Sequence, residues 1–239
     1  MHKESNIRSI VKGITWRFLA TLTTVSLVLL FTGKADVALA VGGIEVFLKI
    51  FIYFLHERGW GKIRWGKQEI QPFVVWITGL SGSGKTSMAR MVAENLNKQG
   101  LRTDHLDGET IRGLFPRTGF TRGAVIEHIE RVGLLASRLE ESGVFVVASF
   151  ISPYLESREF VRNLCHNYVE VHVSTPVEVC EERDRKGLYQ RARKGEIQHF
   201  PGIDVDYELT DRPELEIDTT SVSVEEAAER IVHYLKRFM

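Results

Sequence analysis

The sequence predicts an α/β fold in which a parallel sheet carries helices on both faces, preceded by an α-helical two-pass transmembrane hairpin. Three features support this prediction. Short apolar runs alternate with helical patterns from about residue 71 onward, a glycine-rich loop follows the first of these runs, and two long apolar stretches stand near the N-terminus. We therefore expect a membrane domain over residues 1–66 and an α/β domain over residues 67–239.

The membrane prediction comes from residues 14–31 and 37–55, which are mostly apolar and are separated by Gly33-Lys34-Ala35-Asp36. Each stretch is close to the roughly 20 residues that a helix needs to span a bilayer. Because basic residues flank the pair and the turn is nearly neutral, the positive-inside rule places both termini and the α/β domain in the cytoplasm, with the lipid bilayer of the inner membrane as a partner. The flanking basic residues are Lys3, Arg8, Lys12 and Arg17 before the pair and Arg58, Lys62, Arg64 and Lys67 after it.

Other interpretations of this region stay open. A basic start, an apolar run and Ala38-Leu39-Ala40 are also typical of a signal peptide with its cleavage site, although a second apolar run follows at once. A buried helical hairpin in a soluble protein is another alternative, because charged residues interrupt both runs. Glu45 and Lys49 are four residues apart on one helix face, which favours either a mutual ion pair or a site for an ion or small anion.

The α/β region is predicted from runs of apolar residues and from helical spacing. Strands are expected at residues 73–77, 101–106, 144–148 and 168–173, and helices at 87–96, 125–141, 177–183 and 223–238. The last helix has a capping signature, because Glu226 follows Ser223 by three residues. Since the carboxyl ends of parallel strands meet at one edge of a sheet, we expect the glycine-rich loop, Asp107 and residues 149–153 to converge there.

The glycine-rich loop is the most informative motif of the chain. Residues 79–86 read GLSGSGKT and fit G-x-x-x-x-G-K-[ST], the phosphate-binding P-loop. Glycines let the backbone approach phosphates, and the following helix offers free N–H groups. Lys85 would neutralise the β- and γ-phosphates, and the Thr86 hydroxyl would hold Mg²⁺, so ATP and Mg²⁺ are the expected cofactors. The candidate nucleotide-binding residues are Gly79, Ser81, Gly82, Ser83, Gly84, Lys85, Thr86 and Ser87.

Charged residues beyond the loop suggest the rest of the chemistry. Asp107 is placed to orient Mg²⁺-bound water or to accept the proton of an attacking hydroxyl, and its alternative role is that of a helix N-cap. Arg112 is suited to bind an anionic substrate, or it is a solvated surface residue. The basic run 183–194 is typical of a solvated face and also of a mobile lid over the phosphates. The formal net charge of zero argues against nucleic acid as a partner.

Seven blocks occur in order between about residues 71 and 219: residues 79–86, Leu106-Asp107-Gly108, Gly119-Phe120, Phe150-Ile151-Ser152-Pro153, Thr175-Pro176 with Cys180-Glu181, Lys186-Gly187-Leu188-Tyr189, and Gly202-Ile203-Asp204 with Tyr207-Glu208. Through these blocks the region resembles adenylyl-sulfate kinase, the enzyme that phosphorylates the 3′-hydroxyl of adenosine 5′-phosphosulfate (APS). Near the N-terminus, Ile14-Thr15-Trp16-Arg17, Ile44-Glu45 and Leu55-His56-Glu57-Arg58 resemble a small, poorly characterised family of two-helix membrane domains.

The resemblance implies a role for individual residues. Lys85 and Asp107 would be catalytic, with Thr86 and Asp107 near the metal ion. A homodimer is the oligomeric state that it suggests. Arg112 would bind the phosphosulfate, and Phe120 and Phe200 would enclose the adenine of APS. The remaining implied contacts are Asp107, His128, Ile151 and Ser152 for the acceptor, Lys186, Gly187 and Leu188 in the lid beside it, and Arg183 and again Lys186 for the nucleotide.

Departures from the family pattern are concentrated on the acceptor side. The family's Asp-Gly-Asp-Asn reads Asp107-Gly108-Glu109-Thr110 here, its substrate-binding arginine is Val125, and its substrate-binding asparagine is His128. Three hypotheses follow. The first is a membrane-tethered adenylyl-sulfate kinase. The second is a related kinase with a different nucleotide-like or small hydroxyl acceptor. The third is a nucleotide-responsive membrane module without catalysis.

Overall fold

The computed structural model describes residues 2–4, 7, 10–16, 18–20, 23, 35–63, 67–115, 119–211 and 213–239, without the side chains of 2–4, 35–47 and 67–69. The chain divides into two compact units, Met1–Ile70 and Gln71–Met239. Each unit is described by itself.

The first unit is built around one long helix. Helix α2 spans Ala35–Lys62, and strand β1 (His2–Glu4) pairs antiparallel with β2 (Lys67–Glu69). Helical residues at 10–16 pack against the end of α2: the rings of Trp16 and Tyr53 meet edge to face at 4.9 Å, and Lys12 forms a 2.9 Å ion pair with Glu57. The motif residues Thr15 and His56 also meet, with Oγ1 and Nε2 3.1 Å apart.

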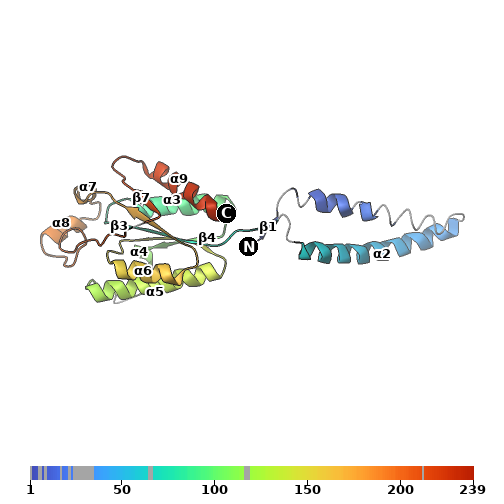
Figure 1. The fold of residues 1–239 in the computed structure, drawn as a ribbon, viewed down its shortest axis with the longest axis horizontal. Coiled ribbons are helices and arrows are strands. Elements are labelled where there is room, and N and C mark those ends of the chain that lie inside the picture. Colours follow the sequence, from blue (N-terminus) through green and yellow to red (C-terminus); the bar gives the residue numbers. More distant parts are fainter. Residues whose placement is uncertain are drawn as a thin grey trace. The chain divides into compact units, whose positions relative to one another are not determined.

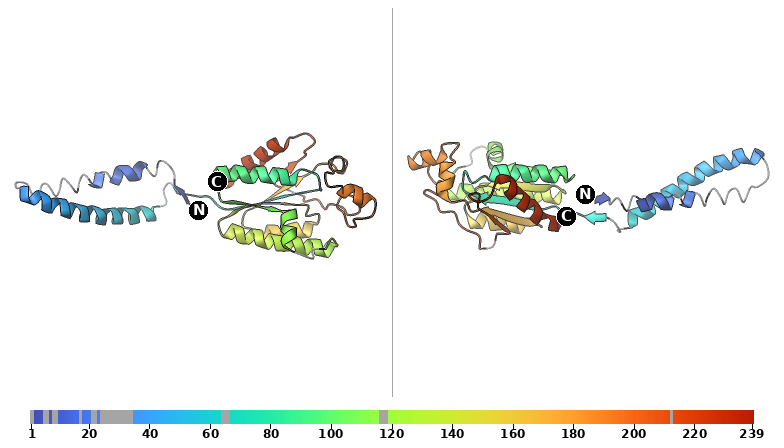
Figure 2. Two further views of the ribbon diagram at one scale, coloured as in Figure 1. Left: turned by 180° about the vertical axis from the view of Figure 1, so that it is seen from behind. Right: turned by 90° about the horizontal axis from the view of Figure 1, so that it is seen from above.

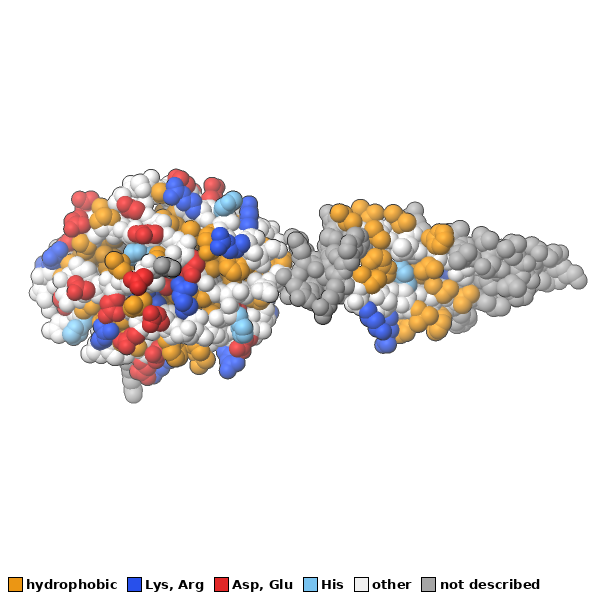
Figure 3. Space-filling model, in the orientation of Figure 1, with side chains coloured by type: hydrophobic (Ala, Val, Ile, Leu, Met, Phe, Trp, Pro, Cys, Tyr) orange, Lys and Arg blue, Asp and Glu red, His pale blue; other side chains and the backbone are white. Residues whose placement is uncertain are grey.

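The described surface of this unit is largely apolar. Figure 3 shows hydrophobic side chains over most of its described part, and the exposed ones are Ile7, Ile10, Ile14, Phe18, Ile50, Phe51, Tyr53, Phe54, Leu55 and Ile63. Within the described ranges, no helix is found with both the length and the apolar character needed to cross a membrane. Several parts of the predicted hairpin lie outside what the structure describes. They are the turn at Gly33, most of the first predicted membrane helix, Arg17 and the side chain of Glu45.

The second unit contains a five-stranded sheet in the order β4-β5-β3-β6-β7, and all its described pairings are parallel. The strands are β3 (Val74–Gly79), β4 (Thr103–Asp107), β5 (Phe145–Phe150), β6 (Tyr168–Val173) and β7 (Leu215–Ile217). Strands β3 and β5 are buried along their whole length, which explains why they read as continuous apolar runs rather than alternating patterns. The predicted parallel sheet is therefore confirmed.

Helices cover both faces of this sheet, as Figures 1 and 2 show. One face carries α3 (Lys85–Lys98) and α9 (Val224–Leu235, followed by a 3₁₀ turn to Phe238), and the other carries α4 (Gly108–Leu114), α5 (Arg122–Glu141) and α6 (Leu155–Leu164). Helices α7 (Val177–Glu182) and α8 (Leu188–Arg193) lie at the end of the sheet where the strands finish. The predicted cap of α9 is confirmed, because the Ser223 hydroxyl accepts from the backbone N–H of Glu226.

One hydrophobic core lies between the sheet and α5 and α6. Trp76 stacks on Phe150 at 5.2 Å between ring centres, and both rings pack among the apolar side chains of the two helices. Helix α5 begins at Arg122, three residues before the predicted start, because Thr121 caps it by accepting from the N–H of Ala124. This core fixes the carboxyl edge of the sheet, where the candidate site lies.

Candidate active site

The loop after β3 has a backbone conformation that depends on its glycines. Gly79 and Gly82 have φ values of +145° and +79°. A Cβ atom would lie 2.5 Å from the Val173 carbonyl oxygen if added to Gly79, and 2.7 Å from the Cys180 carbonyl oxygen if added to Gly82. Only glycine fits at both positions, so the loop wraps closely against β6 and α7.

Helix α3 begins at Lys85 without a side-chain cap, which leaves its first backbone N–H groups available to an anion. The Lys85 ammonium group is buried and donates to the carbonyl of Leu80 at 2.5 Å and to the hydroxyl of Ser83 at 3.3 Å. Burial lowers the pKa of Lys85 to about 8, although Cys180 and Asp107 oppose this shift. The lysine is thus curled into the loop, and both of these acceptors belong to the loop itself.

Asp107 ends β4 beside this loop. Its Oδ1 accepts from the Thr86 hydroxyl at 3.0 Å, and its Oδ2 accepts from the N–H groups of Glu109 and Thr110 at 3.1 and 3.3 Å. Burial raises the pKa of Asp107, but hydrogen bonds from Thr110, Thr86 and Glu109 outweigh this and lower it overall. Asp107 is therefore an ionised carboxylate that caps α4 and faces α3, and its predicted N-cap role is confirmed.

Two further side chains extend this arrangement along the sheet edge. The Ser149 hydroxyl donates to Oδ1 of Asp107 at 3.4 Å, and Nε2 of His105 lies 3.1 Å from the same hydroxyl. Burial lowers the pKa of His105, so the ring is predominantly neutral at pH 7.

The acceptor side contains buried nitrogen atoms without partners. The guanidinium of Arg112 lies over the exposed ring of Phe120 at 4.7 Å, and its buried Nη1 has no hydrogen-bond partner in the described part of the chain. His128 is 2 % exposed between the rings of Phe115 and Phe150, and neither of its ring nitrogens has a partner among the described residues. Burial, followed by the charges of Arg112 and Arg131, lowers the pKa of His128 to about 4.

The loop after β5 is held from beneath. The carbonyl of Ile151 accepts from the Thr78 hydroxyl at 2.7 Å, and the Ser152 hydroxyl accepts from Nε1 of Trp76 at 3.0 Å. Ser152 is buried and has a φ of +42°, a left-handed conformation that is uncommon outside glycine. The structure thus uses the Ser152 side chain within the protein, whereas its contact with a substrate stays a prediction.

The residues of the predicted lid make contacts with different parts of the protein. Arg183 donates to the hydroxyl and carbonyl of Thr219 at 2.7 and 2.9 Å, and Thr219 in turn donates to the carbonyl of Ser83 in the loop. Lys186 is exposed and forms a 2.5 Å ion pair with Glu109 at the start of α4. Gly187 has a φ of +64° at the start of α8.

The other lid residues form a small hydrophobic cluster. Phe200 is buried and meets Tyr189 edge to face at 4.9 Å, and Leu188 packs against the same cluster. The structure therefore shows the packing role of Phe200, and its predicted contact with an adenine ring remains to be tested.

Comparison with known proteins gives the family. The model of the adenylylsulphate kinase family matches residues 71–218. The adenylyl-sulfate kinase of Halothermothrix orenii is 43 % identical over 163 residues, covering 68 % of this chain and 88 % of the relative, and that of Bacillus pumilus is 45 % identical over 166 residues, covering 68 % and 84 %. The chain belongs to the adenylyl-sulfate kinase family.

Solved structures agree with this assignment, and a second family model matches the N-terminal part of the chain. A structure of the Mycobacterium tuberculosis APS kinase in complex with AMPPNP and APS has a TM-score of 0.67 at 37 % identity, over 70 % of this chain and 98 % of that one. A hexameric APS kinase from Thiobacillus denitrificans matches with a TM-score of 0.54 at 29 % identity, over 71 % of this chain and 29 % of that chain. Residues 10–61 match a family described as a predicted membrane protein.

Sequence reasoning missed several residues of this adenylyl-sulfate kinase domain. Asp184 accepts from the N–H groups of Leu188 and Tyr189 at 2.8 Å each, and so shapes the start of α8. The Tyr189 hydroxyl donates to the carbonyl of Ser81 at 2.8 Å and ties α8 to the loop after β3. Asp184 precedes Gly187 by three residues, an aspartate–glycine turn signal that the sequence did offer.

Proposed function

We propose that this protein is a membrane-tethered adenylyl-sulfate kinase that transfers the γ-phosphoryl group of ATP to the 3′-hydroxyl of APS, giving ADP and 3′-phosphoadenylyl sulfate. The observation that carries the proposal is the 3.0 Å contact between Thr86 of the phosphate loop and the Asp107 carboxylate. It brings the donor side and the acceptor side of a phosphoryl transfer to one edge of the sheet. Family membership supports the choice of substrates.

On the nucleotide side, the free N–H groups at the start of α3 and Lys85 would bind the phosphates of ATP, together with Gly79, Ser81, Gly82, Ser83, Gly84 and Ser87. The Thr86 hydroxyl and the Asp107 carboxylate form a donor set of two adjacent oxygens, which fits the preference of Mg²⁺ for oxygen ligands. When bound there, Mg²⁺ would supply neutralisation of the developing phosphate charge. Arg183 and Lys186 would contact the nucleotide from the lid.

On the acceptor side, Asp107 would accept the proton of the 3′-hydroxyl as that oxygen attacks in line. Its lowered pKa makes it a weak base, which suits a loose phosphoryl transfer where positioning counts more than base strength. Arg112 and His128 would receive hydrogen-bonding groups of APS on their unpartnered nitrogens. Phe120 and Phe200 would enclose the adenine, and Ile151, Ser152, Gly187 and Leu188 would line the remaining wall.

The first unit would anchor the kinase domain in the membrane. We infer a two-pass hairpin domain over residues 1–66 and a kinase domain over residues 67–239, with both termini on the cytoplasmic side. Support comes from the family match over residues 10–61 and from the exposed apolar side chains of this unit. Protease digestion of sealed vesicles tests the topology: cleavage of the kinase domain only in inverted vesicles agrees with it, and cleavage only in right-side-out vesicles contradicts it. The homodimer that the family resemblance suggests is a separate proposal, and the molar mass of the purified chain from light scattering tests it.

The activity is tested with the purified full-length chain in detergent or nanodiscs. We expect turnover of Mg·ATP and micromolar APS to ADP and 3′-phosphoadenylyl sulfate, and its loss in Lys85→Ala. Exposed Lys98 at the end of α3 offers a matched control, and Lys98→Ala should keep full activity. Equal turnover by wild type and Lys85→Ala would overturn the proposed mechanism.

A second candidate keeps the kinase and changes the acceptor. It is favoured by the unpartnered nitrogens of His128 and by Val125, which leave this side with different hydrogen-bonding groups from those of the family pattern. A screen of nucleotides and small hydroxyl compounds, each with Mg·ATP, decides between the candidates. A kcat/KM for APS far above that of every other acceptor rejects the second candidate.

A further inference from the structure

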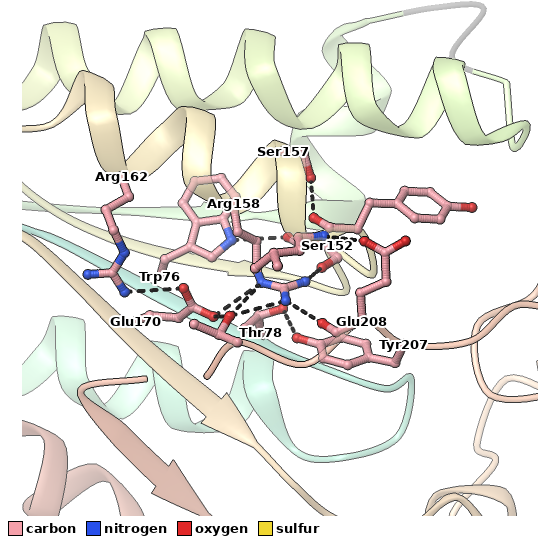
Figure 4. A network of polar contacts seen from close by, with 12 residues as sticks. Trp76, Thr78, Ser152, Ser157, Arg158, Arg162, Glu170, Tyr207 and Glu208 are labelled. Atoms are coloured by element: carbon pink, nitrogen blue, oxygen red, sulfur yellow. Dashed lines mark hydrogen bonds and ion pairs between the residues drawn. The ribbon is translucent and has the colours of Figure 1, made fainter. Parts of the chain in front are cut away.

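Figure 4 shows a buried arginine that contacts the loop after β5, which is called the acceptor loop here (residues 151–155). Arg158 of α6 is 1 % exposed, and its Nε donates to Glu170 of β6 at 3.1 Å. Its Nη1 donates to the carbonyl of Ser152 at 2.5 Å, and its Nη2 donates to the carbonyl of Glu208. One guanidinium group therefore joins a strand, the acceptor loop and the segment that follows the predicted lid in sequence (residues 207–208, the post-lid segment).

The acceptor loop needs such support because its conformation is strained. The left-handed φ of +42° at Ser152 is unfavourable for a residue other than glycine and persists only where neighbours enforce it. Trp76 holds the Ser152 side chain, and Arg158 holds its carbonyl group. The loop is thus fixed from two sides.

The segment after the lid is tied to the same loop. The Tyr207 hydroxyl lies 2.6 Å from the Thr78 hydroxyl, which donates to the carbonyl of Ile151. The N–H of Glu208 donates to the carbonyl of Pro153 at 2.9 Å, and the Glu208 carboxylate accepts from the N–H of Leu155 at 2.7 Å. Hydrogen bonds therefore join residues 151–155 to residues 207–208, and Arg158 lies beneath the place where these two segments meet.

Packing alone does not account for this arginine. A buried ion pair is often no more stabilising than apolar side chains of similar volume, so its presence calls for a geometric reason. The planar fork of arginine can bond two carbonyl groups and a carboxylate at once, which the single ammonium group of lysine does not reproduce. The two carbonyls that it bonds belong to the loop and to the post-lid segment.

We propose that Arg158 is a positioning residue that locks the acceptor loop to the post-lid segment, so that binding of the acceptor depends on it and binding of ATP to the phosphate loop does not. This inference rests on the proposed kinase function. Arg158 acts through Ser152 and Glu208 rather than by touching a substrate.

The test is steady-state kinetics of the full-length chain with Arg158→Lys, which keeps a positive charge beside Glu170 and removes the fork. We expect KM for APS to rise about tenfold while KM for ATP stays within about twofold. The matched control is Arg162→Lys. Arg162 binds the other oxygen of Glu170 at 3.3 Å and directs its remaining hydrogen bonds to Glu214, so both KM values should stay near those of wild type.

A second variant keeps the test decisive if Arg158→Lys does not fold. Tyr207→Phe removes only the hydroxyl that contacts Thr78, and it should raise KM for APS about threefold with KM for ATP unchanged. An unchanged KM for APS, or equal rises for both substrates, in a folded variant overturns the inference. Absence of APS turnover in the wild type would instead reject the proposed function, and the two failures are therefore distinguishable.

Discussion

The Thr86 hydroxyl donates to Oδ1 of Asp107 over 3.0 Å, although the two residues are 21 positions apart and belong to different elements. The contact joins the first turn of α3 to the end of β4, while the other oxygen of Asp107 caps α4. One carboxylate therefore orients two helix N-termini at the edge of the sheet. Replacing this carboxylate by an amide, which can still cap α4, should affect catalysis more than folding.

We predict that Asp107→Asn lowers kcat by about a hundredfold or more, the usual range for loss of a general acid or base. Asparagine is as good an N-cap as aspartate, so α4 should persist and the melting temperature should change little. Kinetics and thermal unfolding of the same preparation check this prediction. Glu109→Gln, at the neighbouring exposed position, is the control and should keep most of its activity. A kcat for Asp107→Asn within twofold of wild type would contradict it.

The buried ammonium of Lys85 should make stability depend on pH above neutrality. Its pKa is about 8 in the folded chain against 10.5 for an ordinary lysine. Between these values the unfolded chain holds a proton that the folded chain has released, so stability should rise with pH in this window. Relative to Lys85→Met, the wild type should gain on the order of 1–3 kcal/mol between pH 8 and pH 10.

Chemical unfolding of both proteins at several pH values measures this difference. Lys98→Met removes an exposed lysine from the same helix and should run parallel to the wild type throughout. If the free energies of unfolding of wild type and Lys85→Met also change in parallel from pH 7 to pH 10, the pKa of Lys85 is not lowered by burial.

The acceptor side predicts a gain of function. Val125 is partly buried on α5, one turn before His128, and the family resemblance implies an arginine and an asparagine at these two positions. The double variant Val125→Arg/His128→Asn should lower KM for APS about tenfold, because a charge-assisted hydrogen bond is worth roughly 1.5–3 kcal/mol. KM for ATP serves as the internal reference. A raised KM for APS would contradict this prediction, because it would mean that Val125 and His128 suit APS better than arginine and asparagine do.

Acid stability offers an independent test of His128. Its pKa is about 4 in the folded chain against 6.5 for an ordinary histidine, so between these values the unfolded chain binds the additional proton. Stability should therefore fall as the pH drops from 6.5 to 4, and His128→Asn should lose less stability over this range. His166 is an exposed histidine, and His166→Asn is the control that should follow the wild type. Equal acid sensitivity of His128→Asn and wild type would show that the buried ring does not cause the effect.

Much of the kinase unit was predictable because its signals are local. Short stretches of sequence determine the phosphate loop, the strand before it and the cap of α9. The structure confirms their positions. Strand β7 was missed because only Leu215–Ile217 pair with β6, too few residues for a periodic pattern. The bonds of Arg158 were also missed, since they join residues 6 to 50 positions apart that only the folded chain brings together.

The lid contact of Tyr189 supports a last prediction. Its buried hydroxyl donates to the Ser81 carbonyl at 2.8 Å, which holds the first part of the phosphate loop against α8. Tyr189→Phe leaves that carbonyl without this donor and should lower stability by about 1 kcal/mol. Because the loop binds ATP, KM for ATP should rise about threefold while KM for APS changes less, the reverse of the split expected for Arg158→Lys. Tyr234→Phe, on α9, is the matched control, and equal KM values for ATP in Tyr189→Phe and wild type would show that the loop holds its shape without the lid.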